Sequence, residues 1–205
     1  MKRILTLCVL IALALGLSAC RGGEPEEPAP NPVATVTMGD GSAMRFELRP
    51  DMAPNTVANF VTLANRGFFD GQQFFRVISG AFIQAGDPRN NGTGDPGYAI
   101  RGEFADNGFP QNTLSHRRGT LSMARQSDYN SAGSQFFIMH YNYPEYDGKY
   151  AAFGTILDEE SLAVLDAIAT QPVDGNYLPL TRQVISSIRV ETYEREFEVV
   201  TIDRK

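Results

Sequence analysis

The chain has 205 residues, which is enough for one good hydrophobic core and too few for two large domains. Its 42% hydrophobic and 20% charged residues exclude a disordered or fibrous protein and are typical of a globular one. The formal net charge of −6, without any run of lysines or arginines, gives no support to nucleic-acid binding, which requires a clustered basic surface.

Residues 1–19 have the organisation of a secretory signal peptide. A positive start, MKR, precedes the apolar stretch ILTLCVLIALALGL, and small residues then lead to Cys20. The apolar stretch is short for a membrane span of about twenty residues, which disfavours the alternative of a transmembrane anchor. LSAC resembles the lipobox of bacterial lipoproteins. That resemblance implies that Cys20 is lipidated and tethers the mature protein to a membrane of the bacterial cell envelope, outside the cytoplasm.

The part of the chain that follows Cys20 contains no further cysteine, because the other one, Cys8, lies in the signal peptide. A disulfide, a cysteine nucleophile and a thiolate metal site are therefore excluded from the mature domain. Residues 20–32 comprise the lipidated cysteine and a stretch rich in proline and glutamate. This stretch has no large apolar group and predicts an extended, disordered tether.

From Val33 onward the pattern predicts two strands and a helix. VATVT and AMRFEL are strand-like runs joined by MGDGS, whose Gly-Asp-Gly sequence indicates a hairpin turn. APNTVANFVTLANRG predicts a helix, because Pro54 suits its first turn, Gly67 suits its end and apolar residues recur at helical spacing. The recurring residues are Val57, Phe60, Val61 and Ala64.

A second helix is predicted within EESLAVLDAIAT, where Leu162, Leu165 and Ala169 share one face. Most other apolar segments are short, rich in Phe, Val and Ile, and interrupted by Gly, Pro, Asn and Asp. The pattern favours a mainly antiparallel β domain with two helices, as a sheet packed with helices or as a barrel.

The two histidines do not indicate a metal site. His116 and His140 lie far apart in sequence and lack the partners of the known zinc motifs. We expect His116, which precedes two arginines, to be a solvated loop residue rather than a catalytic base. GTGDPG matches a dinucleotide-binding pattern, but the sequence before it is not a strand and the sequence after it is not a helix, so a loop is expected.

Five phrases carry a specific resemblance. FDGQQFFRVISGAFIQAGDP, NGTGDPGY, RGTLSMAR, NSAGSQFFI and DGKYAAFG occur in the order found in cyclophilin-type peptidyl-prolyl isomerases. The resemblance covers Val33 to Val190 and implies a closed eight-stranded antiparallel β-barrel with a helix over each end. It predicts an isomerase domain over residues 33–192. The C-terminal extension, residues 193–205, has no function that the sequence indicates.

The resemblance implies a peptidyl-prolyl cis-trans isomerase that acts on Pro-containing polypeptides, without a cofactor and as a monomer. Arg76, the one charged residue of QFFRVISGAFIQAG, lies where the family has its catalytic arginine. Rotation of the X–Pro bond breaks no bond, so the catalyst has to stabilise the twisted amide. A fixed cation directed at the amide nitrogen does this.

The resemblance implies substrate-binding roles for further residues. If one strand continues through Ser79 and Gly80, then Arg76, Phe82 and Gln84 share a face. Gln84 would hold the substrate backbone, and Phe82 and Phe137 would line the proline pocket. The other implied contacts are Tyr146 on the pocket wall, Ala124 and Arg125 at the border of the groove, and Gln135.

Alternative interpretations remain for several of these residues. Phe82 and Phe137 are by default core residues, Arg125 is by default a solvated loop charge, and Gln135 is either a groove contact or a buried amide. The chain departs from the family pattern at Ala81, Glu145 and Tyr150. The second hypothesis is therefore a weakly active or inactive module that binds Pro-containing segments, although Arg76 favours the enzyme. A solute-binding lipoprotein is disfavoured by the small size of the chain.

Overall fold

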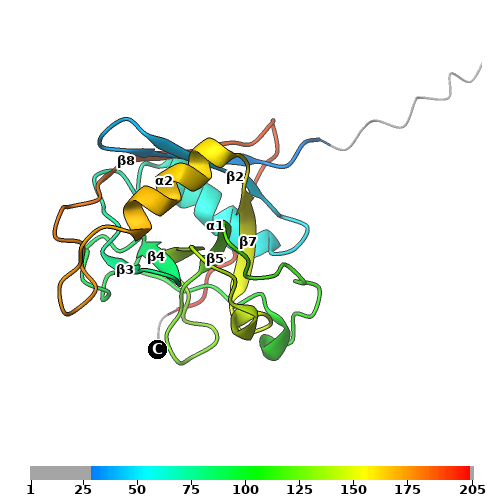
Figure 1. Cartoon of the computed structure of the whole chain (residues 1–205). Helices are drawn as coiled ribbons and strands as arrows, with labels where there is room; N and C mark the ends of the chain where they lie inside the picture. The colour runs from blue at the N-terminus through cyan, green and yellow to red at the C-terminus, as the bar shows by residue number, and fades with distance from the viewer. Residues whose placement is uncertain (1–28, 204–205) are drawn as a thin grey trace, which may run out of the picture.

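The computed structural model describes residues 29–203, so the predicted signal peptide and Cys20 lie outside the described residues. Residues 29–203 form one antiparallel eight-stranded sheet in the order β3-β4-β6-β5-β7-β2-β1-β8, with two α-helices (Figure 1). The strands are β1 (Val33–Met38), β2 (Ala43–Leu48), β3 (Arg76–Ile78), β4 (Phe82–Ala85), β5 (Thr120–Met123), β6 (Phe136–Met139), β7 (Ala151–Ile156) and β8 (Ile185–Glu191). The helices are α1 (Pro54–Asn65) and α2 (Glu159–Ala169), and the short 3₁₀ helices are η1 (Ala105–Asn107) and η2 (Pro144–Tyr146). Neither α-helix of this described part is long and apolar enough to cross a membrane.

The predicted N-terminal hairpin is confirmed. Strands β1 and β2 pair antiparallel, with Val36 opposite Met44. Gly41 adopts a φ of +87° in the turn, a conformation that favours glycine, and its amide donates to the carbonyl of Met38 at 3.0 Å.

Both predicted helices are confirmed. Helix α1 begins at Pro54 and ends near Gly67, whose φ is +74° and whose amide donates to the carbonyl of Ala64. The residue before α1 provides no side-chain cap. The carboxylate of Glu103 instead accepts from the amides of Asn55 at 3.0 Å and Thr56 at 2.7 Å. Helix α2 has a side-chain cap that was not predicted from the sequence: the Asp158 carboxylate accepts from the Ser161 amide.

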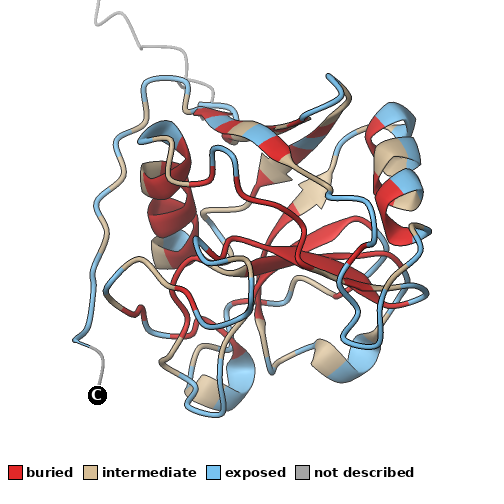
Figure 2. Cartoon of the chain, turned by 90° about the vertical axis from the view of Figure 1, so that its left-hand side faces the viewer, coloured by how far each residue is buried: buried red, intermediate tan, exposed pale blue. Residues whose placement is uncertain are grey.

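The main core fills the curled sheet, and aromatic rings dominate it. Phe60 from α1 lies 5.4 Å from Phe136 of β6 and 5.2 Å from Phe153 of β7, measured between ring centroids. All three are fully buried. Figure 2 shows the two helices on opposite sides of the sheet, with the buried residues between them. Aromatic packing of this kind contributes beyond area burial.

The predicted closure of the barrel is not confirmed. Strands β3 and β8 are the two edges of the sheet, and no strand pairing joins them within the described residues. A single bridge between Gln73 and Val184 links the segments that precede these two strands. The eight strands therefore form a curled, open half-barrel rather than a closed barrel.

The C-terminal segment packs against the domain instead of extending from it. Ile202 and Ala99 exchange two backbone hydrogen bonds, at 2.8 and 3.0 Å. The side chain of Asn55 bonds both backbone groups of Val200. Phe197 and Val199 pack against the main core. Figure 2 shows this segment running down one side of the molecule beside α1.

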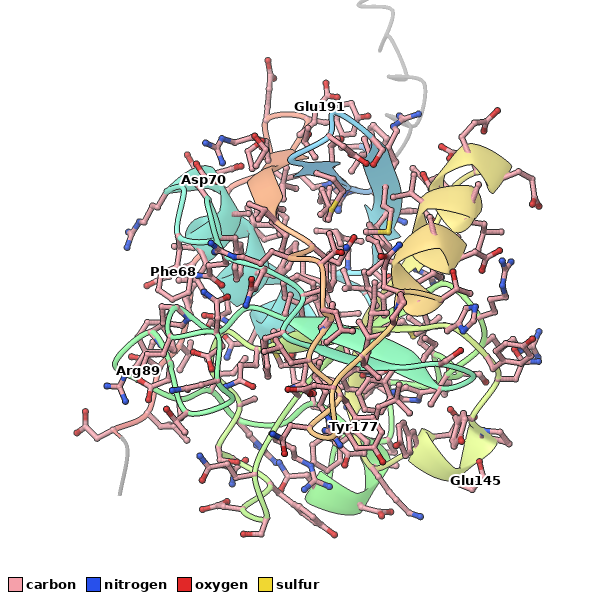
Figure 3. The ribbon with its side chains drawn as sticks, turned by 60° about the vertical axis from the view of Figure 1, so that its left-hand side comes forward. Phe68, Asp70, Arg89, Glu145, Tyr177 and Glu191 are labelled. Atoms are coloured by element: carbon pink, nitrogen blue, oxygen red, sulfur yellow. The ribbon has the colours of Figure 1, made fainter. Side chains whose placement is uncertain are left out.

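The start of the sheet lies far from the β3–β4 hairpin. Val33 pairs with Glu191 of β8, and an Arg195 guanidinium donates to the carbonyl of Ala29. Figure 3 shows Glu191 at the top of the molecule, and Tyr177 and Glu145 in its lower half.

Candidate active site

The β3–β4 hairpin brings Arg76 and Gln84 together. The expectation that one strand continues through Ser79 and Gly80 is wrong. The chain reverses there, and Gly80 has a φ of +79°. Arg76 instead faces Gln84 as its antiparallel partner, and Phe82 lies two residues before Gln84 in β4. Directly opposed residues of an antiparallel pair point to the same face. The three side chains therefore share one face, as expected, for a different geometric reason.

A chain of amide contacts starts at Arg76. Its Nη1 donates to Oε1 of Gln84 at 3.4 Å, and Nε2 of Gln84 donates to Oε1 of Gln135 at 2.9 Å. Nε2 of Gln135 then donates to the carbonyls of Gly92 and Gly94, at 3.1 and 3.0 Å. Gln135 is half-buried and lines a cavity. Its side chain therefore holds Gln84 and the glycine-rich loop at residues 90–94 in fixed positions relative to each other.

Arg76 keeps its positive charge free of an acidic partner. Between the described residues, every ion pair found involves other side chains. The guanidinium lies over the ring of Phe82, with Cζ 5.3 Å from the ring centroid. An arginine does not lose its proton in proteins. The half-buried cation is therefore held in place and available to a ligand.

An aromatic pocket of about 380 Å³ opens beside Arg76. The rings of Phe82 and Phe137 lie 5.4 Å apart, and that of Tyr146 lies 6.0 Å from Phe137, nearly perpendicular to it. Phe82 and Phe137 are buried and yet belong to a small cluster with Ala81 and Met139, separate from the main core. They are thus both packed residues and pocket walls. The remaining lining residues are Ile78, Ala81, Gln84, Ala124, Arg125, Tyr143 and Tyr150.

A second cavity of about 650 Å³ continues from the aromatic pocket. Both cavities are lined by Arg76, Gln84, Ala124 and Arg125, so they form one groove. The far side of the second cavity consists of the glycine-rich loop at residues 90–94 and part of the segment between α2 and β8. All the side chains expected at the site from the sequence line this groove.

Arg125 is not a solvated loop charge, which was the default interpretation of this residue from the sequence. Its Nε and Nη2 donate to the carbonyl of Lys149 at 3.0 and 2.9 Å. Its guanidinium also lies over the rings of Phe104, Tyr129 and Tyr150, at 5.2, 4.6 and 4.7 Å from their centroids. Three rings and a carbonyl fix this cation at the border of the groove.

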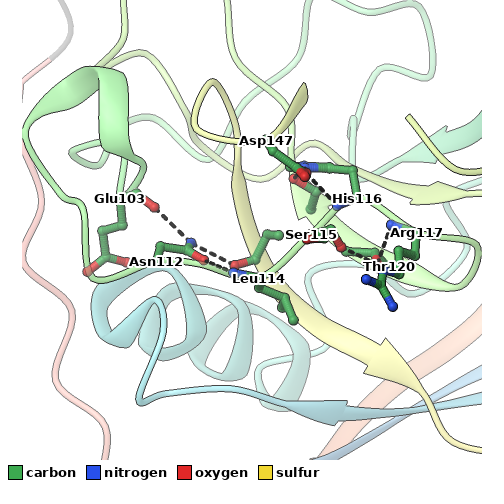
Figure 4. A network of polar contacts seen from close by, with 10 residues as sticks. Glu103, Asn112, Leu114, Ser115, His116, Arg117, Thr120 and Asp147 are labelled. Carbon is green, nitrogen blue, oxygen red and sulfur yellow. Dashed lines mark hydrogen bonds and ion pairs between the residues drawn. The ribbon is translucent and has the colours of Figure 1, made fainter. Parts of the chain in front are cut away.

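The expectation that His116 is solvated is wrong, because its side chain points inward below the pocket. The residue is 1% exposed, and its ring stacks on Phe137 at 6.0 Å. Nδ1 lies 2.9 Å from Oδ1 of Asp147, as Figure 4 shows, and Nε2 lies 2.9 Å from Oγ of Ser122. Burial lowers the pKa of His116, although the hydrogen bond to Asp147 opposes this shift. The prediction failed because it was based on the two arginines that follow His116, which face solvent, whereas His116 does not.

Sequence reasoning did not identify two walls of the pocket, Tyr143 and Tyr150. Tyr143 lies 5.4 Å from Tyr146, and Tyr150 lies 5.0 Å from it. The signal was present in YNYPEYDGKY, which has four tyrosines among ten residues. Burial and the neighbouring tyrosines raise the pKa of Tyr146, so its hydroxyl remains protonated at neutral pH. Glu145 is exposed and lines neither cavity.

The groove suits binding and charge stabilisation rather than bond cleavage. Aromatic rings enclose its pocket, and a permanent cation and an amide lie at its edge. Among residues 29–203, no group of three or more His, Cys, Asp and Glu side chains is arranged to hold a metal ion. The groove thus places aromatic rings next to a fixed cation and an amide that are able to contact polar groups.

The half-barrel and the arginine-edged groove define a β-sheet protein with an aromatic pocket beside a fixed cation. The sequence profile described as "Cyclophilin type peptidyl-prolyl cis-trans isomerase/CLD" matches residues 33–190. The chain therefore belongs to the cyclophilin-type peptidyl-prolyl cis-trans isomerase family, and the predicted isomerase class is confirmed.

Named relatives agree with this family. A peptidyl-prolyl cis-trans isomerase of Helicobacter pylori is 42% identical over 143 residues, which are 70% of this chain and 83% of the relative. Peptidyl-prolyl cis-trans isomerase B of Bacillus subtilis is 46% identical over 117 residues, or 57% of this chain and 78% of the relative. A Cryptosporidium parvum cyclophilin type isomerase, crystallised with the dipeptide Ala-Pro, superposes with a TM-score of 0.68 and 31% identity. That alignment covers 78% of this chain and 99% of the other.

Proposed function

We propose that this isomerase acts on X–Pro bonds of polypeptides outside the cytoplasmic membrane, and that Arg76 is its catalytic residue. The observation that carries the catalytic proposal is the pairing of Arg76 with Gln84 at the edge of the aromatic pocket. A protein that only binds proline segments has no need for a cation without an acidic partner at that point.

The chemistry follows from the barrier to amide rotation. Resonance opposes rotation with about 18–20 kcal/mol, and X–Pro bonds populate both isomers. In the twisted state the amide nitrogen becomes pyramidal and regains its lone pair. An N–H of Arg76 directed at this nitrogen stabilises the twisted state more than either planar isomer, which accelerates exchange. The reaction forms and breaks no covalent bond, so the proposal requires no nucleophile, metal or cofactor.

The other groove residues hold the substrate for this step. Phe82, Phe137 and Tyr146 enclose the proline ring, with the contact area that buried aromatic side chains provide. Gln84 holds the substrate backbone, and Gln135 keeps the Gln84 amide oriented. Ala124 and Arg125 border the passage between the two cavities. The Ala-Pro dipeptide named for the C. parvum relative supports a Pro-containing substrate.

The proposed location outside the cytoplasmic membrane depends on the sequence of the leader. The charged start, the apolar stretch and the LSAC motif occur in the order of a lipoprotein signal, and Cys20 is the residue to be lipidated. Lipid attachment holds a protein at a membrane without any charge attraction, which agrees with the acidic composition of this chain.

The catalytic proposal is tested by magnetisation-exchange NMR on a proline tetrapeptide with the full chain. We expect the protein to accelerate cis–trans exchange without changing the isomer ratio. Arg76→Ala should lose most of the acceleration, on the order of 10²–10³-fold, as expected for removal of one transition-state donor. The control is Arg117→Ala, which removes an exposed arginine that lines neither cavity of the groove.

Two outcomes separate the hypotheses. Peptide binding with an unchanged exchange rate in the wild-type protein would establish the binding module instead of the enzyme. Full activity of Arg76→Ala would contradict the role of the arginine and leave the family membership untouched.

A further inference from the structure

The segment between α2 and β8 exposes three large apolar side chains, and one of them, Leu178, lines the groove. Tyr177 is 48% exposed, Leu178 is 36% exposed and Leu180 is 70% exposed. We call residues 177–180 the apolar loop. Isolated apolar residues on a surface are ordinary, whereas several within one short loop at the edge of a binding groove indicate an interaction surface.

Hydrogen bonds hold the apolar loop in one conformation. The carboxylate of Asp174 accepts from the amides of Asn176 and Leu178, at 2.8 and 2.9 Å. The amide of Leu180 donates to the carbonyl of Pro172 at 2.8 Å. Tyr177 has a φ of +65°, which residues other than glycine adopt rarely and at a cost. The loop is thus ordered before any partner binds, which lowers the entropic cost of binding.

The apolar loop is fastened to the strand that carries Arg76. The amide of Val77, the residue after Arg76, donates to the carbonyl of Tyr177 at 2.8 Å. Figure 3 shows Tyr177 beside the β3–β4 hairpin. Leu178 lines the 650 Å³ cavity together with Arg76 and Gln84. A polypeptide whose proline occupies the aromatic pocket therefore reaches the apolar loop by continuing along the same groove.

We propose that the apolar loop binds large apolar side chains of the client polypeptide, a few residues away from the proline being isomerised. This inference rests on the proposed function and names a preferred class of substrate. The occupant is the client chain itself, because the loop is continuous with the groove that binds its proline. Unfolded chains expose the apolar side chains that such a surface binds, whereas folded surfaces largely do not. The loop would thus favour proline bonds in chains that have not finished folding.

The expected effect is a preference in catalytic efficiency. Full burial of a leucine side chain is worth more than a factor of ten in binding, and a contact on an open loop recovers part of that. We expect a peptide with Leu or Phe at the position that reaches the loop to have a kcat/KM about five- to tenfold above its serine counterpart.

The experiment uses two series of proline peptides and the full chain. In each series one residue, two to four positions before or after the proline, is changed between Leu and Ser. The Leu-to-Ser ratio of kcat/KM is then measured for the wild-type protein and for the double variant Tyr177→Asn, Leu178→Ser. Asparagine tolerates positive φ, so the loop conformation is retained. The matched control is Leu157→Ser, which removes a 44% exposed leucine that lines neither cavity.

The proposal expects a ratio well above one at one or more positions, reduced towards one in the double variant and kept in the control. An equal ratio in the wild type and the double variant would overturn it. So would a dimer that depends on Leu178 at the assay concentration, because the occupant of the loop would then be a second copy. Absence of activity on every peptide would instead count against the proposed isomerase function, because activity itself is measured separately from the Leu-to-Ser ratio.

Discussion

The backbone amide of Gly80 donates a hydrogen bond to Nδ1 of His140 at 3.1 Å. Nε2 of the same ring lies 3.2 Å from Oδ1 of Asp166 in α2, and Arg118 binds that carboxylate. Since Nδ1 accepts, the hydrogen of the neutral ring lies on Nε2 and donates to Asp166. His140 thereby joins the β3–β4 turn, which connects the strands that carry Arg76 and Phe82, to helix α2.

Replacing His140 by leucine should loosen this turn. The Gly80 amide and Asp166 lose a partner, so we expect a loss of about 1 kcal/mol of unfolding free energy and a higher KM for proline peptides. His140→Gln is the control, because its amide oxygen can still accept from Gly80. Denaturant unfolding and peptide kinetics measure the two effects. Equal KM values in the leucine variant and the wild type would show that the turn is held by other contacts.

The buried His116 should make stability depend on pH. Its pKa is lowered in the folded protein, chiefly by burial, so the unfolded chain binds a proton at a higher pH than the folded one. The contribution of His116 to the unfolding free energy is therefore fully present above the unfolded pKa of about 6.5. It decreases as the pH falls below that value and becomes constant below the folded pKa.

The measurement is the unfolding free energy between pH 8 and about pH 5, with His116→Asn as the comparison. The variant should have a shallower slope through this window. Asp51 and Asp158 do not contribute to the slope in this pH range. The pKa values of both carboxyls are lowered, so their stabilising effect is lost only at lower pH. Parallel curves for the two proteins would contradict a neutral, buried His116.

Removal of residues 193–205 should destabilise the domain. Phe197 and Val199 lose their packing against the core, and the backbone bonds of Ile202 to Ala99 are lost. We expect a decrease of about 2–4 kcal/mol in unfolding free energy from partial burial of two apolar side chains and the lost hydrogen bonds. Val200→Ser is the control, since Val200 is 68% exposed and bonds Asn55 only through its backbone. Unchanged stability after truncation would mean that the segment contributes nothing in solution.

Cys20→Ser should prevent lipidation and leave the protein either soluble or attached through an uncleaved leader. Membrane fractionation and mass spectrometry of the mature N-terminus check this result. The same substitution should not alter peptide isomerisation, because the groove lies in the part of the chain from Val33 onward. Wild-type protein found unmodified in a soluble fraction would contradict the lipid anchor.

Local patterns predicted local structure well. Gly41 and its neighbours specify the first hairpin, and the spacing of apolar residues around Phe60 specifies α1, because both depend on contacts between residues close in sequence. The β3–β4 reversal was missed because Ser79-Gly80 is compatible with either a bend or a turn. The choice depends on pairing with β6, which lies more than fifty residues away in sequence.

The errors at the site have the same origin. His116 is buried because Phe137 and Asp147 meet it from distant segments, and no pattern around His116 itself signals this. Arg125 is fixed by rings from three different parts of the chain. The open edge between β3 and β8 depends on how far the sheet curls, a property of the whole assembly of strands.

The pairing of Val33 with Glu191 places the start of the described domain at the far end of β8. Figure 3 shows Glu191, the strand partner of Val33, at the top of the molecule and Tyr177 well below it. A protein attached through its N-terminus, to a lipid bilayer or to a sensor chip, would be held by residues that do not line the groove. Surface-based binding measurements would therefore best use N-terminal attachment.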